Sequence, residues 1–95
     1  MRHDPHARLL KALAQDAKNH SVGVTFSDLS ETPWSSATFT GYRLTMRVSV
    51  DGDGAAWFAA LPEAELSAPG RLVADLAVRH DADATRLELL VLLEA

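Results

Sequence analysis

The segment that decides the fold is residues 71–93, RLVADLAVRHDADATRLELLVLL. Leucine, alanine and valine recur at every second position on both sides of the Asp-Ala-Asp-Ala stretch at 81–84, and this period of two is typical of half-buried strands. The pattern predicts an antiparallel hairpin that turns at residues 81–84. Every core-facing pair then joins two apolar residues, as cross-strand pairing favours: Val78–Leu87, Leu76–Leu89, Ala74–Val91 and Leu72–Leu93.

Two helices are predicted upstream of this hairpin. Apolar residues recur at spacings of three and four over residues 5–19, which forms one stripe suited to packing against a sheet. Asp4 is a suitable N-cap residue, and Pro5 fits the first helical position. A second, shorter helix is predicted over residues 55–61, because Pro62 prevents its continuation.

Two more strands are predicted between these helices, over residues 21–27 and 36–50, joined by turn-forming residues at 30–33. In the second strand the apolar residues change phase, since Phe39 lies at an odd position and the later ones at even positions. Gly41 lies at the changeover and permits a β-bulge that would bring all of them to one face. Without a bulge, Phe39 points to the opposite face, and the sequence leaves both alternatives open.

The order of the elements, α-β-β-α-β-β, predicts an α+β fold. The N-terminal helix packs on a four-stranded, mostly antiparallel sheet, and the short second helix lies between the two hairpins. The 95 residues suit one domain, and 47% hydrophobic residues with a net charge of -4 exclude intrinsic disorder. We therefore expect one domain over residues 1–95, with a frayed N-terminus at residues 1–4.

Composition excludes several classes of function. Nine Lys and Arg residues against thirteen Asp and Glu residues do not favour nucleic-acid binding. The longest apolar run, at 89–93, is far shorter than the roughly 20 residues of a membrane span. The chain has no cysteine, which excludes disulfides and thiolate metal sites. No apolar stretch of a secretory signal follows the N-terminus, so we expect a soluble protein located in the cytoplasm.

The sequence patterns that resemble metal sites are better explained as turns and helix caps. Asp51–Gly54 begins like a calcium-binding loop, but the later ligand positions of that loop are not matched. His3 and His6, and likewise His80 with its neighbouring aspartates, have no spacing that fixes metal ligands. Motifs for a nucleophile elbow, a P-loop or a dinucleotide site are absent from the sequence. We assign no catalytic, cofactor-binding or metal-binding residue, expect no cofactor, and do not expect an enzyme.

The strongest functional indication is the face of the sheet that one helix cannot cover. Residues that point to this second face form an apolar surface, and such surfaces usually mark interfaces. Either the short helix or another chain must cover it. Because symmetric dimers are the commonest oligomers, we expect a non-catalytic interaction or regulatory module that forms a homodimer there. The candidate interface residues are Phe39, Val73, Ala77, Leu90 and Leu92.

The alternative function is a small-molecule-binding protein or minor enzyme. Its pocket would lie between the first helix, the sheet and the short helix around Trp57, with Trp34 and Tyr42 as further walls. His80 and Asp75 are the candidate polar anchors, since a mid-strand carboxylate among apolar neighbours needs a partner if it is buried. Pairing of Asp75 with a nearby arginine is the simpler explanation. The identity of the protein partner or ligand is left open.

Overall fold

The computed structural model describes residues 6–93, so the expectations for residues 1–4 and Pro5 lie outside the described part of the chain. The predicted fold class is confirmed, with an N-terminal helix, an antiparallel sheet of four main strands and a short second helix. The elements in chain order are α1 (Ala7–Asn19), β1 (Gly23–Ser35), β2 (Thr40–Asp51), α2 (Ala55–Ala60), the 3-10 turn η1 (Leu61–Glu63), β3 (Ser67–Ala68), β4 (Arg71–His80) and β5 (Thr85–Leu93).

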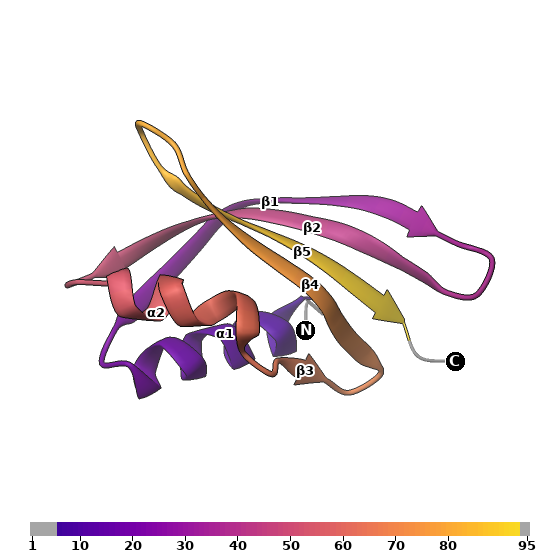
Figure 1. Ribbon diagram of the computed structural model, residues 1–95, viewed down its shortest axis with the longest axis horizontal. Coiled ribbons are helices and arrows are strands. Elements are labelled where there is room, and N and C mark those ends of the chain that lie inside the picture. Colours follow the sequence, from indigo (N-terminus) through magenta and orange to yellow (C-terminus); the bar gives the residue numbers. More distant parts are fainter. Residues whose placement is uncertain (1–5, 94–95) are drawn as a thin grey trace, which may run out of the picture.

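The sheet has the strand order β1-β2-β5-β4-β3, and every neighbouring pair is antiparallel. The C-terminal strand β5 is therefore central, while β1 and the two-residue β3 form the edges. Both helices lie on one side of the sheet (Figure 1). We call the side toward the helices the inner face and the opposite side the outer face. No helix among the described residues is long and apolar enough to span a membrane.

The hydrophobic core fills the space between the inner face and the two helices. Leu9 and Leu13 of α1 and Trp57 of α2 belong to the same buried cluster as the inner side chains of β2 and β5. The Trp57 indole Nε1 donates a hydrogen bond to Asp16 Oδ2 at 2.9 Å, which joins α2 to α1. The short helix therefore shares the inner face with α1, and neither helix of residues 6–93 covers the outer face.

The β4–β5 hairpin matches its predicted register near the loop only. Two of the predicted core-facing pairs form, namely Val78–Leu87 and Leu76–Leu89. Further along, a β-bulge leaves Ala74 without a partner residue between the pairs made by Val73 and Asp75. Successive side chains of a strand alternate between faces, so one extra residue reverses the faces of all residues beyond it.

This bulge exchanges Leu72 and Val73 between the two faces, and the predicted pairs at this end are wrong. Val73 pairs with Val91 and packs against the core, although strict alternation placed it on the outer face. Leu72 pairs with Leu92 instead of Leu93. It lies on the outer face, where 48% of its surface is exposed.

The first hairpin also differs from the sequence prediction. Residues 30–33 do not form a turn, because β1 continues through them to Ser35. Instead, β1 has a β-bulge between Ser27 and Ser30, where its register with β2 shifts. Asp28 lies in this bulge, in the left-handed region at φ 54°. Pro33 is tolerated because β1 is an edge strand with a partner on one side only.

Gly41 does not mark a bulge. It pairs with Trp34 of β1 and with Leu92 of β5 without a shift of register on either side. A glycine is needed for another reason, since a Cβ atom at this position would overlap the backbone carbonyl oxygen of Val91. Phe39 lies in the loop before β2, where 51% of its surface is exposed.

Candidate functional site

Four strands bring side chains together in rows that cross the outer face. The row nearest the β1–β2 loop is apolar, and its leucines come from the central strand β5 and from β4. Gly41 of β2 has no side chain, so the row presents only backbone between Trp34 of β1 and Leu92 of β5. We call this set the apolar row, and it consists of Trp34, Gly41, Leu92 and Leu72.

The next row combines a leucine with two opposite charges. Leu90 of β5 lies between Arg43 of β2 and Asp75 of β4. Both charged side chains are exposed, and neither makes an ion pair or hydrogen bond with another residue in the range 6–93. We call Arg43, Leu90 and Asp75 the mixed row. It carries one positive and one negative charge, placed on either side of the central strand.

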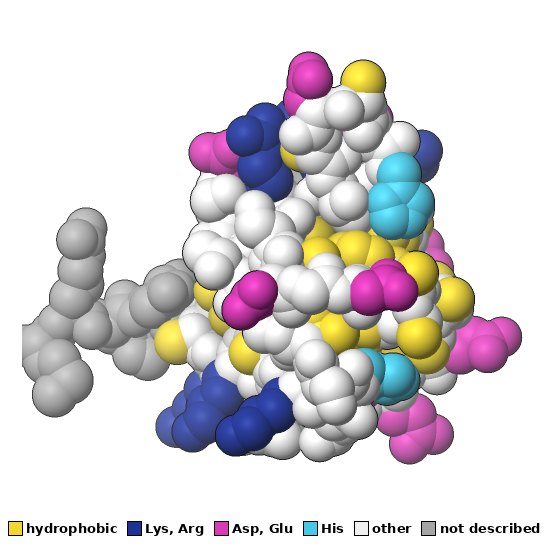
Figure 2. All heavy atoms as spheres, turned by 90° about the vertical axis from the view of Figure 1, so that its left-hand side faces the viewer, with side chains coloured by type: hydrophobic (Ala, Val, Ile, Leu, Met, Phe, Trp, Pro, Cys, Tyr) yellow, Lys and Arg dark blue, Asp and Glu magenta, His cyan; other side chains and the backbone are white. Residues whose placement is uncertain are grey.

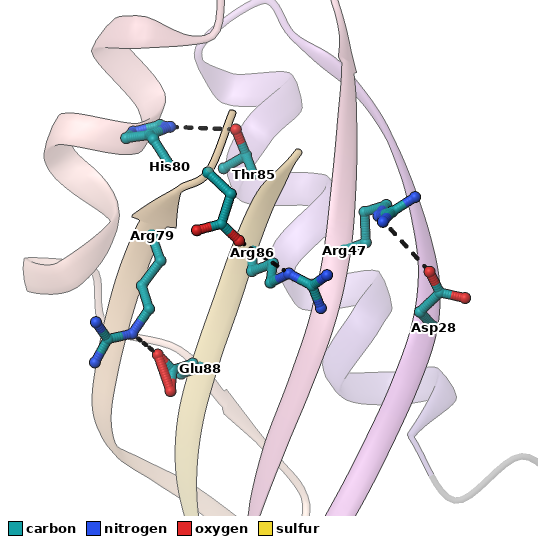
Figure 3. A network of polar contacts seen from close by, with 8 residues as sticks. Asp28, Arg47, Arg79, His80, Thr85, Arg86 and Glu88 are labelled. Atoms are coloured by element: carbon teal, nitrogen blue, oxygen red, sulfur yellow. Dashed lines mark hydrogen bonds and ion pairs between the residues drawn. The ribbon is translucent and has the colours of Figure 1, made fainter. Parts of the chain in front are cut away.

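The far end of the outer face is charged. Arg47, Arg86 and Arg79 occupy directly paired positions on β2, β5 and β4, where like charges repel. We call them the arginine row. Each has a carboxylate close by (Figure 3), and the ion pairs are Arg47 Nε–Asp28 Oδ2 at 3.6 Å, Arg86 Nε–Asp81 Oδ2 at 3.1 Å, and Arg79–Glu88. Such exposed pairs each contribute only about 0–1 kcal/mol, but together they offset the repulsion.

The structure divides the predicted interface residues between three places. Ala77, Leu90 and Leu92 lie on the outer face. Val73 lies on the inner face, and Phe39 lies in the loop at the apolar end. Leu72 and Trp34 also lie on the outer face, where the sequence pattern did not predict them. Their placement depends on the two β-bulges, which strict alternation does not include.

The five predicted pocket residues do not converge on one cavity. Tyr42 and Trp57 are buried in the core on the inner side of the sheet. Trp34 and Asp75 lie on the outer face, and Asp75 is exposed. His80 ends β4, next to α2. Because the sheet separates the two groups, they cannot line a common pocket.

A different pocket, of about 560 Å³, lies between α2 and the loop end of the β4–β5 hairpin. Its apolar lining includes Phe58, Pro62 and Val78. Figure 2 shows apolar side chains gathered beside a histidine on this side of the molecule. His80 packs edge-on against Phe58 at a ring distance of 5.4 Å, and its Nδ1 lies 3.2 Å from Thr85 Oγ1. The pocket could hold a small apolar ligand with one polar group.

A histidine and a carboxylate meet where α1 begins. His6 Nε2 lies 3.0 Å from Glu31 Oε1 of β1, and the His6 ring packs edge-on against Tyr42 of β2 at 5.4 Å. The Tyr42 hydroxyl is buried without a hydrogen-bond partner among the described residues. No sequence pattern links these three positions, because α1, β1 and β2 meet here only through the fold. Their contacts fix the start of α1 against the sheet.

A metal site is not formed by the described residues, where no group of three or more His, Cys, Asp or Glu side chains could hold an ion. His3 lies outside the described range. Function is therefore inferred from the outer face and the pocket beside α2. Comparison with protein-family models found no match for this chain, and neither did comparison with curated proteins or with solved structures.

Proposed function

We propose that this protein is a non-catalytic interaction module that forms a homodimer through the apolar end of its outer face. The observation that carries the proposal is the apolar row. Leu72, 48% exposed, lies beside Leu92 and in one row with Trp34 on a face without helices. Full burial of a leucine side chain is worth about 1.5–3 kcal/mol, so covering this row gives a substantial driving force for association.

A second copy of the chain is the partner that we propose. A symmetric dimer uses the same patch twice, so one apolar patch is enough to build the interface. Residues within the row differ in size, from tryptophan to glycine, which allows protruding groups to fit against recessed ones. A cytoplasmic location is part of the proposal, because a chain without cysteine suits a reducing compartment.

Sedimentation velocity of the unmodified protein tests this proposal. Between concentrations of about 1 μM and about 1 mM, we expect the sedimenting mass to rise from that of one chain to that of two and then to stop rising. Light scattering on the same samples checks that larger species do not form. A single, well-behaved monomer at the highest concentration would contradict the homodimer.

A second candidate function is binding of a small apolar ligand beside α2, which the pocket of about 560 Å³ favours. We expect a ligand from a metabolite library to raise the melting temperature by several degrees, since binding to the folded state stabilises it. An Ala59→Trp variant fills this pocket and should lose the shift. Ala56→Trp places the same side chain elsewhere on the exposed surface of α2 and should keep it. A shift that survives Ala59→Trp would place the ligand somewhere else.

A further inference from the structure

We infer, on the basis of the homodimer proposed above, that its two copies are related by a two-fold axis parallel to β5. In this arrangement Leu72 of each copy lies over Gly41 of the other. Arg43 of each copy pairs with Asp75 of the other. The inference rests on the strand order, on the shape of the apolar row and on the charges of the mixed row.

The strand order determines which residues meet. β5 is central, with β2 on one side and β4 on the other. A half-turn about an axis parallel to β5, between two facing sheets, exchanges the β2 side with the β4 side and keeps each row opposite itself. Each β2 residue then faces the β4 residue of the same row in the other copy, and each β5 residue faces its own counterpart.

The apolar row is complementary to itself under this rotation. Gly41 presents bare backbone on β2, and Leu72 is the most exposed apolar side chain of the row on β4. The rotation places the protruding leucine over the glycine, and it places Leu92 against Leu92 of the other copy. Two facing sheets pack by such interdigitation of side chains.

The mixed row is complementary in charge. Arg43 and Asp75 stand on opposite sides of Leu90 and make no ion pair or hydrogen bond within the described part of one chain. The rotation brings each of them to its opposite charge in the other copy. Two equivalent ion pairs would then flank a contact between the two Leu90 side chains. Complementary charges of this kind fix the register of an interface.

The arginine row limits the size of the contact. The same rotation places Glu88 against Glu88 of the other copy in the row of Thr45 and Ala77. In the arginine row it places Arg86 against Arg86, and Arg47 against Arg79. Like charges at an interface are costly, so close contact ends at the mixed row, before these two rows. The dimer would therefore be held by the apolar and mixed rows alone.

The other simple two-fold axis fits less well. An axis across the strands at the apolar row would place Gly41 over Gly41 and Leu72 over Leu72, so the bare backbone would stay unfilled. It would also place the mixed row of each copy beyond the loop end of the other copy's outer face. Arg43 and Asp75 would then face no charged residue of the other copy. Shape and charge thus favour the axis parallel to β5.

Charge reversal with mixing tests the inference. In an Arg43→Asp homodimer each new aspartate faces Asp75, and in an Asp75→Arg homodimer each new arginine faces Arg43. We expect both variants to self-associate about tenfold or more weakly than the unmodified protein. Mixed in equal amounts, they should form a one-to-one heterodimer, because every facing pair then has opposite charges. Native mass spectrometry and sedimentation of the mixture measure this recovery, which contacts within one chain cannot produce.

The two proposals fail in different ways. If the unmodified protein dimerises and both charge variants dimerise equally well, the axis is wrong and the homodimer stands. If the unmodified protein is monomeric, the homodimer fails and the axis fails with it. Circular dichroism melting of each variant confirms folding, which exposed positions such as Arg43 and Asp75 should not disturb.

A cross-linking measurement avoids charge reversal altogether. The chain has no cysteine, so single cysteines can be introduced at Thr45 and Ala77, which lie in one row of the outer face on β2 and β4. Under the proposed axis, a short bis-maleimide should join a Thr45→Cys chain to an Ala77→Cys chain. It should join two identical variant chains far less. Equal yields from like and unlike chains would overturn the axis.

Discussion

Under the proposed homodimer, a Leu92→Asp variant is expected to remain a monomer at concentrations where the unmodified protein dimerises. Leu92 lies on the central strand within the apolar row, so the change removes apolar surface from the interface. Under the proposed axis it also sets two carboxylates against each other. We expect the dissociation constant to rise by about 100-fold or more, which corresponds to about 2.7 kcal/mol. Sedimentation velocity over a concentration series measures the change.

A matched control separates this effect from that of added negative charge. Ser49 is exposed on β2, opposite Thr25, at the far end of the outer face. Ser49→Asp adds the same charge away from the apolar and mixed rows and should leave the dimer almost unchanged. If Leu92→Asp dimerises as tightly as Ser49→Asp does, the apolar row is not the interface.

Gly41→Ala is expected to cost about 3 kcal/mol of the free energy of unfolding, in line with insertion of a carbon atom where no space exists. The added Cβ would overlap the carbonyl oxygen of Val91, which belongs to the backbone of the neighbouring strand. Because a backbone atom cannot turn aside as a flexible side chain can, β2 and β5 must separate here, near the β1–β2 loop. Urea denaturation followed by circular dichroism gives the loss.

Gly23→Ala is the control for this experiment. A Cβ atom at Gly23 would lie 3.6 Å from Asp51 Cβ, which is ordinary van der Waals contact. Since alanine is more favourable than glycine inside a strand by about 0.5–1 kcal/mol, this variant should be as stable as the unmodified protein or slightly more stable. Equal stability of the two alanine variants would show that the sheet accommodates a side chain at Gly41.

The repeat of two in residues 71–93 was sufficient to predict the second hairpin and its loop, because that pattern reflects which face is buried. The bulge at Ala74 could not be read from the same residues. A bulge arises where a strand must fit the shape of its neighbours, and the local sequence at Ala74 carries no glycine or proline to signal it. Similarly, residues 30–33 have turn-forming character, yet Pro33 is compatible with an edge strand, and edge position is a property of the whole sheet.

The candidate interface shows the same division. The sequence has one long helix, which can cover only one face of the sheet, and its strands have apolar residues on both faces. These two observations were enough to predict an apolar second face. Which residues occupy it depends on the bulges, since one extra residue brings Leu72 to the outer face and takes Val73 away. Trp34 lies there only because β1 extends beyond residue 33. The proposal that Arg43 pairs with Asp75 across two copies also required the strand order, which places β5 between β2 and β4.

The edges of the sheet, and the long strand β1 above all, determine whether copies of the chain could add to it strand by strand. An open edge can add further strands without limit, which leads to fibres, and proteins prevent this with prolines, bulges and short edge strands. β1 has Pro33, which lacks an N–H group, and the irregularity around Asp28. At the opposite border the two-residue β3 covers only the start of β4, and the rest of that border is β4 with its own bulge at Ala74. Growth by strand addition is therefore disfavoured at both borders. In the proposed homodimer, the second copy covers the outer face and leaves no equivalent surface to extend, so the proposed assembly closes at two chains.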